Sequence, residues 1–126
     1  MNTVLNSIKV LFLVSALIIA QIGFGQDQPK IDSLFQVLRT SKQDTNKVLL
    51  LYNLSREFFN SDIDRAEKYS NRALFLSERL GYKKGIAMSY NNLGIINYYN
   101  AVYNVALTYH DRSLEIMSEI GNRKGM

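Results

Sequence analysis

Side chains that are mostly apolar or aromatic recur every three or four residues, the spacing of a helix, in three stretches of the chain. Ile31, Leu34, Phe35 and Leu38 stand at i, i+3, i+4 and i+7, the apolar stripe of a surface helix, which predicts a lead-in helix over about 30–40. Steps of three and four residues also relate Ile86, Tyr90, Leu93 and Asn97, and then Tyr103, Ala106, Leu107, His110, Leu114 and Met117. The stretch between these two sets is short, so their helices must be antiparallel neighbours. No segment alternates apolar and polar residues with period 2, and we therefore expect an all-α fold.

Residues that favour helix ends complete this pattern. Asp44 is a candidate N-cap for a helix over 45–59, and Ser61 or Asp62 is a candidate N-cap for a helix that ends near residue 80. Gly81 and Gly121 each follow a helical stretch, where a glycine often ends the helix in the left-handed conformation. The chain after residue 30 is therefore expected to form a lead-in helix and two helix pairs.

The two helix pairs carry an internal repeat. LGYKKGI at 80–86 aligns with IGNRKGM at 120–126, and the same offset relates Ala66 to Ala106. A fixed period in this range indicates stacked helical units. The offset fails in the first helix of each pair, because Leu54 and Ala66 are one position closer in sequence than Leu93 and Ala106.

Small side chains stand where helices of the repeat are expected to cross. Gly94 lies in the middle of a predicted helix, where Gly is about 1 kcal/mol less favourable than Ala. Ala66 and Ala106 occupy the same place in successive units. A close crossing that excludes larger side chains accounts for both features. We predict that the units pack through Ala66, Ala73, Leu93, Gly94, Ala106 and Leu114.

Over residues 44–126 these positions resemble the tetratricopeptide repeat (TPR) family. In that family the first helix carries a large residue followed by Leu-Gly, and the second carries a small Ala, an aromatic residue or His, and another small residue. The second unit matches this pattern with Tyr90, Leu93, Gly94, Ala106, His110 and Ser113, and the first unit with Leu54, Ser55, Phe58, Ala66, Ser70 and Ala73. Asn97 stands where the family usually has Tyr.

The resemblance implies a TPR-type α-solenoid of antiparallel helix pairs. The usual period is about 34 residues, and the 40-residue variant with a Gly-x-x-x-Gly linker is similar to repeats of bacterial signalling proteins. A HEAT-type repeat of the same length and a four-helix bundle without repeats are the alternatives. The Leu-Gly and small-Ala positions favour TPR over HEAT, and the repeated linker argues against the bundle.

TPR arrays bind peptides or protein surfaces on a concave face lined by first helices. The resemblance implies that this face in the second unit comprises Met88, Asn91, Asn92, Ile95, Tyr98 and Tyr99. Asn donates and accepts hydrogen bonds, which suits an extended backbone, and Tyr offers apolar area with a polar tip. Asn92 matches the position whose Asn contacts the ligand backbone in peptide-binding members. The alternative is that these residues contact a neighbouring repeat or solvent.

Residues 1–25 have the plan of a secretory signal peptide. Residues 1–9 are polar with a single positive charge, an uncharged and largely apolar run follows over 10–22, and Gly23-Phe24-Gly25 precedes a cleavage site before Gln26. The apolar run is short for a bilayer span, which needs about 20 residues. An uncleaved anchor is the alternative. No Cys is present for lipid attachment.

Composition excludes several functions. Without Lys9 the chain carries 14 basic and 11 acidic residues, a net charge of +3, and the charges alternate in sign as on a solvated helix face. Clustered Lys and Arg for nucleic-acid binding are lacking. With no Cys and one His, neither a disulfide nor a thiolate zinc site can form, and no cofactor is expected. His110 is expected to be a packed, half-buried side chain, and Glu115 and Glu119 to be solvated, so we identify no catalytic residue.

The sequence therefore predicts a non-catalytic module that binds a protein or peptide. We expect it to be the exported sensory or recruitment part of a larger signal-transduction protein, similar to the input regions of bacterial sensor histidine kinases. It would be periplasmic, or tethered to the membrane and facing the periplasm, contacting the membrane only through the signal peptide or a downstream segment. A stand-alone exported scaffold or assembly factor is the alternative, and an enzymatic activity would need residues beyond Met126. The expected divisions are a signal peptide (1–25), a lead-in helix (26–43), repeat 1 (44–81), repeat 2 (82–121) and the start of a third repeat (122–126). Further repeats of the same parent chain would then pack against repeat 2 as an additional partner.

Overall fold

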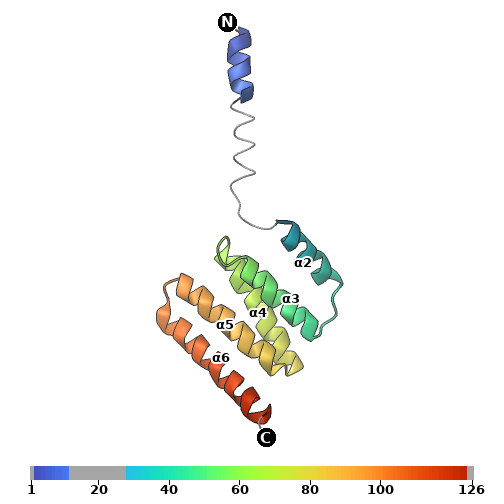
Figure 1. Cartoon of the computed structure of the whole chain (residues 1–126), viewed down its shortest axis with the longest axis vertical. Coiled ribbons are helices and arrows are strands. Elements are labelled where there is room, and N and C mark those ends of the chain that lie inside the picture. Colours follow the sequence, from blue (N-terminus) through green and yellow to red (C-terminus); the bar gives the residue numbers. More distant parts are fainter. Residues whose placement is uncertain (1, 12–27, 125–126) are drawn as a thin grey trace.

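The computed structural model describes residues 2–11 and 28–124, and every regular element in these two ranges is a helix (Figure 1). Residues 2–11 are helical, whereas residues 12–25 of the expected signal peptide lie outside the described residues. The five helices that follow are α2 (Gln28–Thr40), α3 (Thr45–Glu57), α4 (Ile63–Leu80), α5 (Lys83–Tyr99) and α6 (Tyr103–Lys124). The all-α fold is confirmed.

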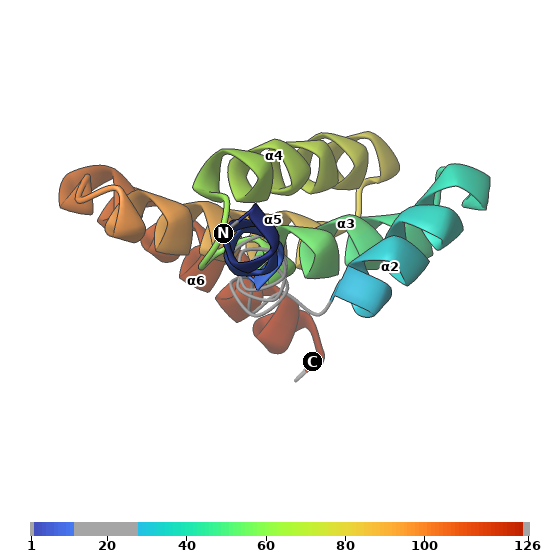
Figure 2. The ribbon, with the colours of Figure 1, turned by 90° about the horizontal axis from the view of Figure 1, so that it is seen from above.

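Each helix from α2 to α5 packs against the helix that follows it, and α3 also contacts α5. The short turns make α3 and α4, and again α5 and α6, antiparallel pairs. Figure 2 shows α4 lying across α3 and α5, so that one helix joins the two pairs. The helix α2 contacts only α3 among the described helices.

The helix ends have the caps that their sequences favour. The Asp44 carboxylate accepts a hydrogen bond from the backbone N–H of Lys47 at 3.1 Å, and the Asp62 carboxylate accepts one from Arg65 at 3.0 Å. Gly81 is left-handed with φ 62°, and the backbone N–H of Tyr82 donates to the Ser77 carbonyl at 2.9 Å. The predicted ends at Asp44, Asp62 and Gly81 are therefore confirmed.

The prediction that Gly121 ends a helix is wrong. The helix α6 continues through this residue to Lys124, and Gly81 is the one described glycine with positive φ. Residues 122–124, expected to begin a third repeat, are part of α6, and residues 125–126 lie outside the described range. Glycine permits the left-handed conformation but does not require it. At Gly81 the helix end is held by α5 packing back on α4, and no described helix packs in this way after Gly121.

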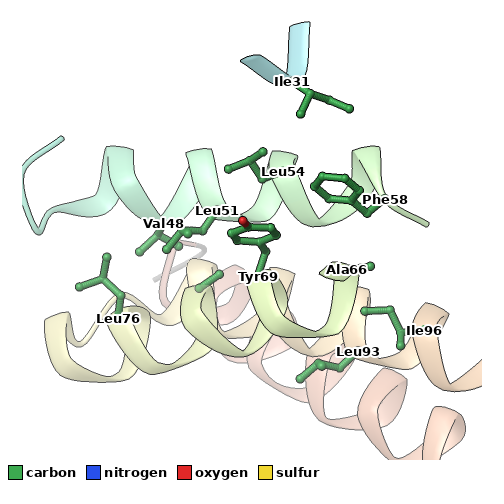
Figure 3. Close-up of a cluster of buried hydrophobic side chains, with 11 residues drawn as sticks. Ile31, Val48, Leu51, Leu54, Phe58, Ala66, Tyr69, Leu76, Leu93 and Ile96 are labelled. Carbon is green, nitrogen blue, oxygen red and sulfur yellow. The ribbon is translucent and has the colours of Figure 1, made fainter. Parts of the chain in front are cut away.

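The hydrophobic core lies between α3 and α4 and extends to α2 and α5 (Figure 3). In the close-up, side chains from α3 and α4 face one another across the interface, with Ile31 of α2 above and Leu93 and Ile96 of α5 below. The Phe58 and Tyr69 rings stack with their centroids 5.9 Å apart. Full burial of a Leu, Ile or Phe side chain in this core stabilises the fold by about 1.5–3 kcal/mol.

Small residues mark the closest helix contacts. Of the residues expected to pack the repeat, Ala66, Ala73, Leu93, Gly94 and Ala106 are buried. A Cβ atom added to Gly94 would lie 2.7 Å from Cε1 of His110, so α5 and α6 approach closely at this glycine. Leu114 differs from the expectation because it is 70% exposed and no described helix covers it.

Candidate functional site

A hollow of about 550 Å³ opens beside the C-terminal half of α3, where the start of α2 and the end of α5 approach. We call it the α2–α3 hollow. Lys30 of α2 and Glu57 of α3 form an ion pair at its edge. It is lined by Lys30, Leu34, Asn53, Arg56, Glu57, Phe59, Asn60 and Tyr99.

A row of aromatic rings extends from this hollow to the start of α6. Ring centroids are 6.5 Å apart for Phe59 and Tyr99, 6.3 Å for Tyr99 and Tyr98, and 5.5 Å for Tyr98 and Tyr103. Tyr98 and Tyr103 are each 61% exposed and Tyr99 is 55% exposed. The row presents apolar rings and phenol groups together to solvent, which suits contact with a partner chain.

Polar groups of α3 complete the lining of the hollow. The guanidinium of Arg56 lies over the Tyr52 ring, 5.6 Å from its centroid. The amides of Asn53 and Asn60 are exposed and offer both donors and acceptors. An extended backbone lying here would find partners for its N–H and C=O groups.

Two of the residues assigned to the concave face lie in contacts between helices. Asn92 is 1% exposed, and its Nδ2 donates to the Tyr52 carbonyl at 3.3 Å, which joins α5 to α3. Its Oδ1 is buried without a hydrogen-bond partner among the described residues. Asn91 is half-buried, with Oδ1 3.2 Å from Nδ1 of His110 on α6. In this structure Asn92 therefore holds two helices together and is not presented on an open surface.

The other four residues of that set differ in exposure. Met88 and Ile95 are half-buried, whereas Tyr98 and Tyr99 are exposed. Only Tyr99 lines the α2–α3 hollow, and Tyr98 extends its edge. The structure thus brings the two tyrosines to one place and separates them from the asparagines.

The sequence interpretation missed the part of the hollow that belongs to the first unit. Leu54 and Leu93 occupy equivalent positions in the first helices of the two units and are 39 residues apart. Equivalent positions of the second helices, such as Ala66 and Ala106, are 40 residues apart. Applying the shorter offset to Asn92, Ile95, Tyr98 and Tyr99 gives Asn53, Arg56, Phe59 and Asn60, all of which line the hollow. The repeat therefore contained the signal for these residues, whereas Lys30 and Leu34 of α2 lie outside the repeat.

One ionisable group of the described residues has a clearly shifted pKa. A clear pKa shift is found at Glu119, where the hydrogen bond from Lys83 and then its charge lower the carboxyl pKa. Glu119 pairs with Lys83 on the surface of α5 and α6 and is distant in sequence from the hollow. Among the described side chains, no three acidic or His residues gather as metal ligands. No helix in the described part of the chain is long and apolar enough to span a membrane.

No protein-family model, curated protein or solved structure matches the chain. Its function is therefore inferred from the geometry of the described residues.

Proposed function

We propose that the chain is a TPR-type helical-repeat module that binds an extended segment of a protein partner in the α2–α3 hollow. The observation that carries this proposal is the coincidence of that hollow with the row formed by Tyr98, Tyr99 and Tyr103. The first-helix positions that the resemblance assigns to ligand contact recur there as Asn53 and Arg56 of the first unit.

The chemistry of the lining suits a peptide better than a small metabolite. The hollow is open, and its polar groups are spread along α3 instead of converging on one point. Tyrosine contributes large contact areas at a low entropic cost, which is why it is enriched where proteins bind one another. An extended segment that crosses α3 can bond to the asparagine amides and place an apolar side chain against Phe59 and Tyr99.

A selection from a random peptide library displayed on phage tests this function with the full chain as bait. Enriched peptides are expected to bind about tenfold or more weakly to a Tyr98→Ala and Tyr99→Ala double variant, because exposed aromatic side chains dominate such contacts. Leu80→Ala is the control, since Leu80 is also an exposed apolar residue but lies at the end of α4 and does not line the hollow. A selection without enrichment, or peptides equally sensitive to both variants, would contradict the proposal.

We also propose that the chain is exported and acts as the sensory or recruitment part of a larger signalling protein. The support is the three-part plan of residues 1–25 and the resemblance to the repeats of bacterial signalling proteins. N-terminal sequencing of the protein from its native cells should find Gln26 as the first residue. Retention of Met1 would refute cleavage. Sequencing of the gene downstream of residue 126 tests the larger protein, which requires a membrane-spanning segment and an output domain.

A further inference from the structure

A second hollow, between α3 and α4, has a cationic rim. It has a volume of about 340 Å³, and we call it the α3–α4 hollow. Three apolar side chains line it: Leu51 and Leu76 are buried, whereas Phe75 is 61% exposed. The full lining is Gln43, Lys47, Leu51, Asn71, Arg72, Phe75, Leu76 and Arg79.

None of the three cations at this hollow pairs with a carboxylate of a described residue. The guanidinium of Arg79 lies over the Phe75 ring, 5.7 Å from its centroid, and that of Arg72 lies over the Tyr69 ring at 5.6 Å. These ring contacts position the guanidinium groups without neutralising them. The ion pairs of the described side chains are formed elsewhere, by Lys30 with Glu57, Arg65 with Asp62, and Lys83 with Glu119.

At the corresponding positions of its second helix, the second unit keeps one arginine of the rim, with Arg112 at the place of Arg72, and has a carboxylate at the place of Arg79. The 40-residue offset places Asp111, Glu115 and Glu119 of α6 where α4 has Asn71, Phe75 and Arg79. In that unit Glu119 pairs with Lys83 of α5 at 3.0 Å. The repeated helix pair therefore accepts either sign of charge at the position of Arg79, and packing does not dictate the cation there.

We propose that the α3–α4 hollow binds an acidic peptide segment in which carboxylates flank an apolar side chain. The apolar side chain packs against Leu76 and Phe75, and the carboxylates pair with Arg72 and Arg79, whose planar groups suit carboxylate oxygens. An inorganic anion would satisfy the charges but leave the apolar surface uncovered. This site is separate from the α2–α3 hollow, because the two share no lining residue.

Fluorescence anisotropy with the full chain tests this site. The probe is a fluorescein-labelled peptide with Glu-Glu-Leu-Glu-Glu between glycine spacers, and its Gln-Gln-Leu-Gln-Gln analogue serves as the uncharged comparison. The acidic probe is expected to bind about tenfold or more tightly than the analogue, and its binding should weaken as salt is added. Equal binding of the two peptides would overturn the proposal, and so would complete displacement of the probe by inorganic phosphate.

Matched charge reversals locate the binding. Arg72→Glu with Arg79→Glu is expected to weaken probe binding about tenfold or more, whereas Arg39→Glu with Arg123→Glu changes the net charge equally and should leave it unchanged. Similar losses in both variants would mean attraction by net charge alone and would overturn the site. Phe75→Ala should weaken binding several-fold, and no loss would contradict the apolar contact.

A second copy of the chain could also occupy the α3–α4 hollow, with Asp111, Glu115 and Glu119 of its α6 facing the arginines. An experiment on the protein without peptide tells this occupant from an acidic peptide. Sedimentation velocity without peptide is expected to give the same size distribution for the parent chain and the Arg72→Glu, Arg79→Glu variant. Self-association that disappears only in that variant would overturn the proposal, because the hollow would then be filled by a second copy.

Discussion

At the scale of single residues, the closest contact between α5 and α6 depends on a missing side chain. Gly94 lies mid-helix beneath the His110 ring, and three ring atoms would lie within 2.8 Å of an added Cβ. The ring is also fixed by its contact with Asn91. The His side chain thus fills the space that the glycine leaves, which gives the only His of the sequence a packing role.

Gly94→Ala should therefore destabilise the chain, although Ala favours a helix by about 1 kcal/mol over Gly. In a His110→Ala background the same change should be stabilising, because the clash is removed. Thermal unfolding of the parent chain, the two single variants and the double variant is expected to give a coupling free energy between the two substitutions of about 1–3 kcal/mol. Gly121→Ala is the control, since a Cβ there meets nothing within 4 Å. Additive effects of the two substitutions would contradict the close contact.

Ala106 provides a second test of the same helix pair. It is 4% exposed on the inner side of α6, so Ala106→Leu is expected to destabilise the fold by about 1–3 kcal/mol through overpacking. Thr108→Leu, at an exposed position of the same helix, should change the free energy of unfolding by no more than about 0.5 kcal/mol. Denaturant titrations of both variants measure this difference, and equal values would show that the register of α6 is wrong.

At the scale of helices, α5 and α6 are also joined by a surface ion pair whose strength depends on pH. The hydrogen bond from Lys83, then its charge and that of Arg123, lower the pKa of Glu119 below its ordinary value of 4.5, and desolvation opposes the shift. Because the Glu119 carboxylate takes up a proton more readily in the unfolded chain, protonation favours unfolding. The stabilisation of the fold by this ion pair is therefore present above pH 4.5 and is lost as the pH falls through the lowered pKa. Lys83→Met should return the Glu119 pKa toward 4.5, as measured by carboxyl NMR titration. An unchanged pKa would mean that Lys83 does not set it.

The helices themselves were largely predictable because their ends are encoded locally. Asp44 and Asp62 each cap a helix with their own carboxylate, and each such bond joins the carboxylate to a backbone N–H within the same turn. Gly121 shows where local information fails, because its sequence context matches that of Gly81 but its conformation does not. The end at Gly81 depends on α5 folding back on α4, which is a contact between helices.

The candidate site was predictable only in part, for a related reason. The exposed pair Tyr98 and Tyr99 followed from helix positions, but the burial of Asn92 depends on how α3 lies against α5. A helical pattern states which residues share a face and does not state which neighbour covers that face. The contribution of Lys30 to the hollow depends on the placement of α2, for which the sequence repeat holds no counterpart.

At the scale of the whole molecule, one side of α6 is apolar and open. Tyr103, Leu107, Leu114 and Met117 share this side at helical spacing, and all four are exposed. The corresponding side of α4 is different, because α5 packs against that helix and Ser77 there is fully buried. A continuous apolar side of this kind is a common site of association between protein chains.

We therefore expect the chain to self-associate as its concentration rises, with the apolar side of α6 buried between copies. Leu107→Ser combined with Leu114→Ser should shift sedimentation velocity profiles toward the monomer, because it removes apolar area that only association buries. Val37→Ser is the control, since Val37 is an exposed apolar residue of α2. Monomeric sedimentation and a sharp unfolding transition, both independent of concentration, would contradict this expectation. Two stacked units would then be stable alone, although about three are normally needed in a repeat array.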